Sequence, residues 1–357
     1  MVACQTVEIP IQREYNSTET MFPQMPDVYT AFDEEYQSLR QEIAVFDRSD
    51  AGFLFLTGKD VLDFLNRLST NDVLNLKKDD IRSTILITEK AKIIDLVTLI
   101  PYNNGYLLEI SPNNEAKILK WLDKYIIMED VKITDITSDF TKVSITGNKV
   151  SSLTQYLGVF LSNATRQKVY RISLAKKEIL VCMDSLFASN VWNIYCHRED
   201  FGDLLSELTS VSLPGLRIRQ IGKKVFETFR IEEGVPIVGK ELTEYVNPLE
   251  AGLRKIVSST KGCYIGQEVI ARLDTYDKLQ RTLTGFICTA MIEGEGTIHQ
   301  GGNMVGWTTS YCFSPLLNQC LSLGYLKTDI PNEKLILRLT NGIEHPVRTV
   351  ELPLRTI

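Results

Sequence analysis

The most informative stretch of this chain reads RIEEGVPIVGKELTEYVNPLEAGL over residues 230–253 and continues as KGCYIGQEVIARL over residues 261–273. Gly262 allows the backbone to turn tightly and to approach a neighbour or a ligand closely. The residues that follow predict a helix, because apolar side chains recur on one helical face: Ile265, Val269, Ile270 and Leu273. We therefore expect Cys263 just before, or within, the first turn of a helix.

Cys263 is a candidate for a reactive or metal-accepting thiol. Free N–H groups and the positive end of the helix dipole favour a thiolate at a helix N-terminus. Lys261 would add to this effect if its ammonium approaches the sulfur. The alternative is a small buried hydrophobic residue, which is how most free cysteines behave. The sequence leaves both roles open for Cys263 and favours the buried role for the other six cysteines.

Cysteine and histidine usage predicts neither a disulfide framework nor a resident metal site. The chain has seven cysteines, an odd number, and contains no C-x-x-C pair. With three histidines in the whole sequence, a histidine-rich metal centre is not expected either.

Toward the N-terminus from this stretch, helical and strand patterns alternate. Helices are expected where apolar residues recur every three or four positions, at 32–43, 61–68, 115–127 and 200–208. Strands are expected at 51–58, 81–88, 92–100, 106–110, 170–174, 178–183 and 191–196. Asn103, Asn104 and Gly105 predict a hairpin turn between two of these strands. This mixture indicates an α+β protein.

A weak internal echo appears in this region. Leu56-Thr57-Gly58 ends a strand and precedes a helix, and Ile145-Thr146-Gly147 does the same further along the chain. The echo suggests a duplicated α+β unit, although a common supersecondary motif that occurs twice would look the same.

From Arg281 onward the pattern changes to short strands separated by Gly, Asn and Pro. Such strands are expected at 283–288, 304–311, 320–326, 335–339 and 347–352. Short strands with turn residues between them predict a separate antiparallel barrel or sandwich.

Composition excludes several classes of protein. The chain has 357 residues and a formal net charge of −6, whereas a dedicated binder of duplex nucleic acid needs clustered Lys and Arg for phosphate contacts. No segment approaches the roughly 18 apolar residues of a membrane span. The start, MVACQTVEIP, lacks the basic stretch and apolar core of a secretory signal. We expect a cytoplasmic protein without a nucleic-acid or membrane partner.

The octapeptide at 261–268 resembles the K-G-C-Y-x-G-Q-E signature of the YgfZ-type folate-binding proteins, a branch of the glycine cleavage T-protein (aminomethyltransferase) superfamily. All seven defined positions match: Lys261, Gly262, Cys263, Tyr264, Gly266, Gln267 and Glu268. The R-I-E-x-G-x-P run at 230–236 and the P-L-E-A-G-L run at 248–253 are also similar to that family. The resemblance extends from about residue 30 to about residue 330.

The resemblance implies a three-lobed, cloverleaf-like α+β fold around a cavity for tetrahydrofolate or a one-carbon derivative of it. Two α+β lobes, interleaved in sequence, would form a folate-binding region over residues 1–280. A C-terminal antiparallel β-barrel would occupy residues 281–357.

The same resemblance assigns three folate-site residues. Asp95 matches an Asp that faces the reactive folate nitrogen in aminomethyltransferases, unless it is a solvated or capping residue. Arg230 matches an Arg that lines the folate cavity, and its alternative is a buried ion pair with Glu232 or Glu250. Asn193 stands in place of a Glu that reads the pterin, so hydrogen bonding is kept and the charge is lost.

Residues 47–52 lack the His and Met of the corresponding transferase segment, and transferases lack the octapeptide signature. These differences favour a tetrahydrofolate-binding accessory protein for iron–sulfur cluster assembly or repair, acting through Cys263, with reduced folate and iron–sulfur client or assembly proteins as partners. The alternatives are a folate-dependent aminomethyl- or methyltransferase that uses Asp95, and an interaction scaffold with a vestigial cavity. The sequence leaves open whether the protein is an enzyme.

Overall fold

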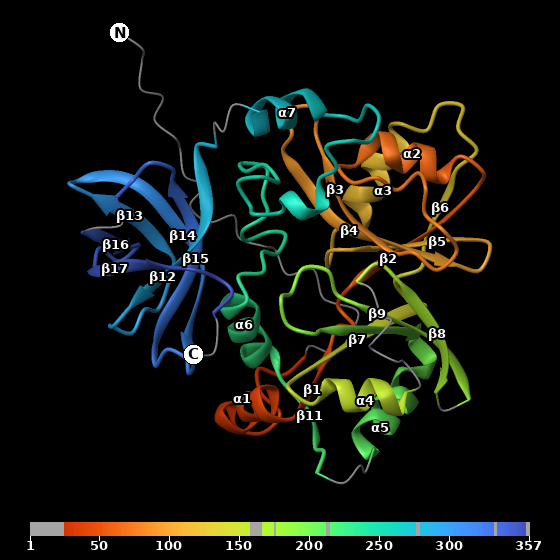
Figure 1. Cartoon of the computed structure of the whole chain (residues 1–357), viewed down its shortest axis with the longest axis horizontal. Coiled ribbons are helices and arrows are strands. Elements are labelled where there is room, and N and C mark those ends of the chain that lie inside the picture. The colour runs from red at the N-terminus through yellow and green to blue at the C-terminus, as the bar shows by residue number, and fades with distance from the viewer. Residues whose placement is uncertain are drawn as a thin grey trace.

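The computed structural model describes residues 25–157, 166–174, 176–211, 215–275, 279–331 and 334–354. It consists of two sheet lobes and a closed barrel, with a helix and long loops between the barrel and the lobes (Figure 1). This confirms the α+β architecture with a C-terminal antiparallel barrel that was expected from the resemblance.

The first lobe is a five-stranded sheet with the order β3-β4-β5-β2-β6. Its strands are β2 (Gly52–Thr57), β3 (Arg82–Ile87), β4 (Ile93–Tyr102), β5 (Gly105–Ile110) and β6 (Lys132–Asp135). The helices α2 (Val61–Leu68) and α3 (Glu115–Asp123) pack on one face of this sheet. Their apolar sides share a buried core with the strands, as the periodicity predicted.

The second lobe is a six-stranded sheet with the order β11-β1-β7-β10-β9-β8. Its strands are β1 (Ile43–Asp47), β7 (Phe140–Thr146), β8 (Val169–Leu174), β9 (Lys177–Met183), β10 (Trp192–His197) and β11 (Ile218–Gln220). The helices associated with it are α1 (Phe32–Gln41), α4 (Val150–Tyr156) and α5 (Phe201–Ser210), the last preceded by the 3₁₀ turn η2 (Arg198–Asp200). Because β1 precedes the whole first lobe in the chain, the two lobes are interleaved.

One detail of the N-terminal prediction is wrong. Ile43 was expected on the first helix, but α1 ends at Gln41 and Ile43 begins β1. Ile43 pairs with Ile218 in the sheet and is fully buried. A buried apolar side chain fits either element, so its helical spacing after Leu39 was coincidental.

The internal echo has the same geometry in both lobes. Gly58 and Gly147 have φ values of 121° and 122°, a region that disfavours any side chain. A Cβ on either would collide with a backbone carbonyl, of Asp130 and of Glu42 respectively. Each of these carbonyls also accepts a hydrogen bond from the residue two places after the glycine. These equivalent contacts support a duplicated unit.

The barrel closes in the order β12-β15-β14-β13-β16-β17. Its strands are β12 (Arg281–Cys288), β13 (Gly296–Gln300), β14 (Asn303–Ser314), β15 (Gln319–Lys327), β16 (Leu335–Leu339) and β17 (Glu344–Val350). Sequence analysis missed β13, in which Ile298 is the one apolar and buried side chain. A strand that contributes one residue to the core gives too little alternation to be recognised.

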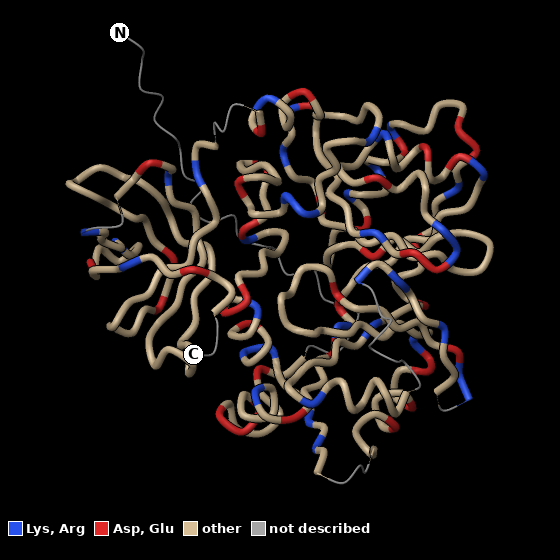
Figure 2. Tube along the Cα trace, viewed as in Figure 1, with Lys and Arg blue, Asp and Glu red and all other residues tan. Residues whose placement is uncertain are grey.

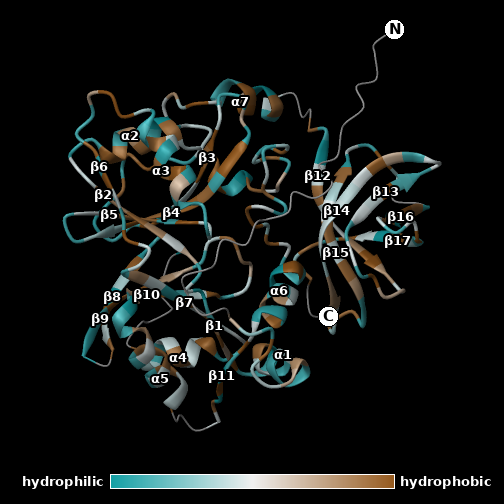
Figure 3. Ribbon diagram, turned by 180° about the vertical axis from the view of Figure 1, so that it is seen from behind, coloured by the Kyte–Doolittle hydropathy of each residue, from teal (hydrophilic) through white to brown (hydrophobic). Residues whose placement is uncertain are grey.

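Three further elements connect the lobes with the barrel. They are α6 (Lys223–Glu232), the 3₁₀ turn η3 (Arg254–Ile256) and α7 (Gln267–Thr275). Hydrophobic residues concentrate on the strands (Figure 3), and the apolar residues of the helices α1, α2, α3, α4 and α5 belong to buried clusters with them. Acidic and basic residues are interspersed on all three bodies (Figure 2). Within the described ranges, no helix is both long enough and apolar enough to traverse a bilayer.

Candidate functional site

A cavity of about 600 Å³ lies where α6, the loops after it and the barrel meet. Its walls are Leu186 from the second lobe, residues 233–236, residues 251–253 and parts of β12, β15 and β17. Two of these wall segments come from the motifs that sequence analysis singled out, R-I-E-x-G-x-P and P-L-E-A-G-L. The fold therefore brings both motifs to one cavity.

Arg230 is bonded to Val235, a wall residue of this cavity, and has no N–H group left for a ligand. Its Nε and Nη2 bond to the Glu227 carboxylate at 2.9 and 2.8 Å, and Nη2 also donates to Ser310 Oγ at 2.7 Å. Its Nη1 donates to the Val235 carbonyl at 3.2 Å and to Glu241 Oε2 at 3.3 Å. These bonds use the five donors of a guanidinium. Arg230 therefore forms a buried ion pair, the alternative that the sequence left open. Its partners are Glu227 and Glu241 instead of Glu232 or Glu250.

Glu241, which sequence analysis did not single out, completes this clamp. Its carboxylate is fully buried and accepts hydrogen bonds from Thr309 Oγ1 at 2.7 Å and from Ser310 Oγ at 2.6 Å, both on β14. The Arg230–Glu241 pair therefore ties α6, the cavity wall and the barrel together. A single buried Glu in a loop gives no periodic signal, so only the fold identifies it.

Asp95 is a buried residue of β4 and does not line the 600 Å³ cavity. Its carboxylate is fully buried and accepts hydrogen bonds from Leu96 N at 2.7 Å, from Ser111 N at 3.2 Å and Oγ at 2.6 Å, and from Asn114 Nδ2 at 2.8 Å. Burial raises the pKa of Asp95, and the hydrogen bonds from Ser111 and Asn114 offset part of the rise. Asp95 thus fastens β4 to the start of α3.

Asn193 lies in β10 with 4% of its surface exposed, and it is hydrogen-bonded to Asp184. Ser144 Oγ donates to Asn193 Oδ1 at 2.7 Å, and Asn193 Nδ2 donates to Asp184 Oδ2 at 3.0 Å. Asp184 in turn accepts a hydrogen bond from the backbone of Leu186, a cavity-wall residue. A carboxylate is therefore present next to Asn193, but it belongs to Asp184 and not to position 193, where the related family has a Glu.

An interlobe cluster joins the two sheets beside this pair. Lys142 in β7 forms an ion pair with Glu109 in β5, and Tyr195 donates from its hydroxyl to Glu109 Oε2 at 2.7 Å. Burial alone would raise the pKa of Glu109, but the Lys142 ammonium and the Tyr195 hydroxyl hold it below its ordinary value. Sequence analysis did not identify this cluster, because its members belong to strands of different lobes.

Of the six cysteines that the structure describes, Cys263 alone is exposed. It lies in the cysteine loop, which we define as residues 257–266, between η3 and α7. Backbone bonds hold this loop against the end of α2, from Ser258 N to Thr70 O at 3.0 Å and from Ile265 N to Arg67 O at 2.9 Å. The thiol is thus accessible on a loop of fixed position. Cys4 lies outside the described residues.

The two expected sources of thiol activation are not found. The helix after the motif begins at Gln267, four positions beyond Cys263, so Cys263 is outside its first turn. The Lys261 ammonium donates to three carbonyl oxygens, those of Asn66 at 2.7 Å, Ser69 at 2.8 Å and Asn71 at 2.6 Å. An ammonium has three donors, so none is left for the sulfur.

The remaining motif residues have distinct surroundings. Tyr264 is buried in the apolar cluster between the first lobe and the barrel, and Gly266 has a φ of 74° and packs against the carbonyl of Thr88. Gln267 accepts a bond from Tyr264 N at 3.4 Å, and Glu268 pairs with Arg272 on the surface. Gly262 has open space where a Cβ would stand, so none of the described residues makes the close approach expected there.

Metal-binding geometry is not found in the part of the chain that the structure describes: no group of three His, Cys, Asp or Glu side chains converges there. Cys263 does not line the 600 Å³ cavity.

Comparison with protein families matches residues 12–261 to the GCVT N-terminal domain and residues 281–354 to the glycine cleavage T-protein C-terminal barrel domain. A chloroplastic protein of Arabidopsis thaliana, described as a proposed transferase, is 31% identical over 301 residues, which cover 83% of this chain and 68% of that protein. An aminomethyltransferase of Caldanaerobacter subterraneus is 28% identical over 310 residues, covering 85% and 82%. The solved structure of the glycine cleavage system aminomethyltransferase T from Bartonella henselae has the same fold, with a TM-score of 0.80 at 18% identity over 92% of this chain and 91% of that one.

Proposed function

The chain belongs to the glycine cleavage T-protein superfamily, and we propose that it is a tetrahydrofolate-binding accessory protein of the YgfZ type that acts through Cys263 in iron–sulfur cluster assembly or repair. The observation that carries this proposal is the exposure of Cys263 on a loop that is fastened to α2. A loop held in this way presents the thiol to a partner at a constant position. The open space at Gly262 leaves room for a partner's backbone beside it.

The residues of the 600 Å³ cavity suit a reduced folate. Ligand cavities for molecules of this size commonly hold about 300–1,000 Å³ and combine apolar walls with a few polar groups. Leu186, Val235 and Leu253 supply apolar wall for flat rings, Thr282, Thr284 and Thr328 supply hydroxyls, and Lys327 supplies a cation. Asp184 and Asn193 do not line this cavity, and they position one wall residue through the hydrogen bond from Leu186 N to Asp184 Oδ1. When bound, the folate would contribute a carrier of one-carbon units.

Cys263 acts, in this proposal, together with a second molecule. An iron–sulfur cluster ordinarily takes about four protein ligands, so one thiolate cannot hold a cluster alone. The other ligands would come from a client or assembly protein docked at the cysteine loop. Arg230 and Lys261 have positioning roles, because the first fixes the cavity wall and the second fixes the loop.

A folate-dependent aminomethyl- or methyltransferase is the second candidate, favoured by the names of the relatives in Caldanaerobacter and Bartonella. The carboxylate assigned to that chemistry, Asp95, is buried and bonded to Ser111 and Asn114. Formation of methylenetetrahydrofolate from an aminomethylated lipoyl carrier protein, lost in Asp95→Asn without loss of folding, would favour the transferase.

Calorimetric titration with tetrahydrofolate under anaerobic conditions tests the cavity assignment. We expect saturable binding by the wild type and at least a tenfold loss in Thr284→Trp, which places a large ring in the cavity. Thr209→Trp, on the exposed surface of α5, is the matched control and should bind like the wild type. Absence of binding by the wild type, or equal binding by Thr284→Trp, would refute the assignment.

A further inference from the structure

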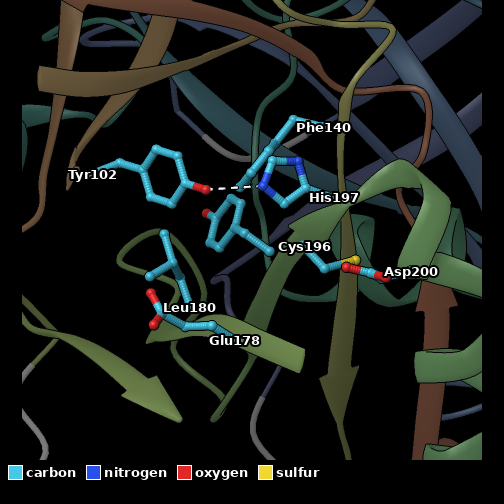
Figure 4. Close-up of a pocket in the computed structure, with 8 residues that line it drawn as sticks. Tyr102, Phe140, Glu178, Leu180, Cys196, His197 and Asp200 are labelled. Carbon is cyan, nitrogen blue, oxygen red and sulfur yellow. Dashed lines mark hydrogen bonds between the residues drawn. The ribbon is translucent and has the colours of Figure 1, made fainter. Parts of the chain in front are cut away.

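A second cavity, of about 250 Å³, opens between the two sheet lobes on the side of β9 and β10 (Figure 4). Eight residues line it: Tyr102, Phe140, Glu178, Leu180, Tyr195, Cys196, His197 and Asp200. Phe140, Leu180, Tyr195 and Cys196 are buried and form its floor, whereas Glu178 and His197 are exposed and stand at its mouth. We call it the His197 cavity. Neither the family motifs nor the proposed folate site includes it.

The walls of the His197 cavity are largely aromatic. Tyr102 and Phe140 meet edge to face with ring centroids 5.4 Å apart, and Phe140 and His197 do so at 5.2 Å. The Tyr102 hydroxyl and His197 Nε2 form a hydrogen bond of 3.0 Å, which Figure 4 shows as the dashed line. The rings therefore support one another and keep the cavity from collapsing.

The charge of the lining is negative. Glu178 and Asp200 are both carboxylates, and the eight lining residues include no lysine or arginine. Burial raises the pKa of Tyr102, and the nearby Glu178 carboxylate adds to the rise. The neighbouring cations are engaged: Lys177 pairs with Asp200 at 2.6 Å, and Arg198 donates to backbone carbonyls. Among the described residues, no ion pair is formed by Glu178.

Aromatic rings together with a carboxylate that has no ion-pair partner among the described residues, here that of Glu178, form the combination that attracts organic cations, since ring faces and carboxylates both carry negative potential. We propose that the His197 cavity binds a small organic ammonium ion. Its size limits the ligand, because about 250 Å³ holds about eight groups of the volume of water, each of which occupies about 30 Å³. An anion would be repelled by the exposed Glu178 carboxylate at the mouth.

The His197 cavity is separate from the proposed folate site but shares one residue with the interlobe cluster. The ring of Tyr195 lines the cavity, while its hydroxyl donates to Glu109 Oε2. A ligand in the His197 cavity would therefore contact a residue that also bonds across the two lobes. The proposal stands or falls independently of folate binding and of Cys263.

This proposal is tested by titration calorimetry of the full chain with choline chloride and with its uncharged isostere, 3,3-dimethylbutan-1-ol. Both titrations are done at the same total chloride concentration. We expect saturable binding of choline at millimolar concentration and binding of the alcohol at least about twofold weaker, because one charge–aromatic contact contributes about 0.5–2 kcal/mol. Glu178→Gln should weaken choline binding by about threefold to tenfold. Glu199→Gln, an exposed neighbour outside the cavity, is the matched control and should bind choline normally.

The ring contribution is separated by a second pair of variants. Tyr102→Leu removes a wall of the cavity and should weaken choline binding, whereas Tyr102→Phe keeps the ring and should retain most of the affinity. Both proteins should unfold in a single transition like the wild type. Equal affinity for choline and its neutral isostere, no saturable binding of choline by the wild type, or choline binding unchanged in Glu178→Gln would overturn the proposal.

Discussion

The ammonium of Lys261 lies 2.8 Å from the carbonyl oxygen of Ser69 and donates a hydrogen bond to it. Ser69 directly follows α2 as its C-cap residue. The last carbonyls of a helix lack partners within the helix, and the helix dipole favours a positive charge there. Lys261 therefore serves as a cap for α2 that is supplied from the cysteine loop. This contact fixes the loop, and with it Cys263, to the first lobe.

Lys261→Met should lower the free energy of unfolding by about 2–4 kcal/mol, because it leaves the carbonyls of Asn66, Ser69 and Asn71 without their shared donor. Urea denaturation measures this change. Lys255→Met, at an exposed lysine of η3, is the control and should cost less than about 0.5 kcal/mol. If both variants lose the same small amount, Lys261 does not hold the loop.

Arg230→Met should cost about 3–5 kcal/mol, since it leaves the fully buried Glu241 carboxylate without its cation. Arg254→Met, which breaks an exposed ion pair with Asp274, should cost less than about 1 kcal/mol. Thermal unfolding of the two proteins under identical conditions compares the costs directly. Similar stability of the two variants would show that the Arg230–Glu241 clamp is dispensable.

Asp95→Asn should lower stability by about 2–3 kcal/mol, because an amide cannot accept all the hydrogen bonds that the carboxylate accepts from Leu96, Ser111 and Asn114. Its affinity for tetrahydrofolate should stay within about twofold of the wild type, because Asp95 is buried and does not line the 600 Å³ cavity. A tenfold loss of folate affinity in a folded Asp95→Asn protein would place this residue at the ligand and contradict the assignment of folate to the 600 Å³ cavity.

The Glu109–Lys142 ion pair predicts a specific pH dependence. The folded-state pKa of Glu109 lies below its ordinary value, so the pair stabilises the fold at and above the unfolded pKa of about 4.3. That contribution declines as the pH falls from there through the lower folded-state pKa, because the unfolded chain takes up the proton first. The stability difference between the wild type and Glu109→Gln should therefore shrink on acidification. A difference that is constant from pH 7 to pH 3 would exclude this role.

The sequence predicted most of the fold because the local signals were strong. The helical spacing in 61–68 and the turn at Asn103 to Gly105 correspond to α2 and to the β4–β5 hairpin. The weak signals failed, as in β13 with its single buried Ile298, and at Ile43, whose spacing fits a helix but whose place is a strand.

The site was predictable only in part. Motif matching located the segments that line the cavity and the exposed Cys263, but it assigned contacts that tertiary structure decides. Arg230 bonds to Glu241 and Lys261 bonds to Ser69. Neither partner belongs to the matched motifs, so no local sequence pattern indicates these contacts. Asp184 was missed for the same reason, since its pairing with Asn193 depends on a loop returning to β10.

The central claim, that the protein acts through Cys263, is tested most directly by complementation. Cells that lack this protein would receive the wild type, Cys263→Ser or the control Cys312→Ser, whose thiol is half-buried in the barrel, and the specific activity of an iron–sulfur enzyme would be measured in each at equal expression. We predict full restoration by the wild type and by Cys312→Ser, and no restoration by Cys263→Ser, although that variant folds and binds tetrahydrofolate. Restoration by Cys263→Ser to the wild-type level would contradict the account.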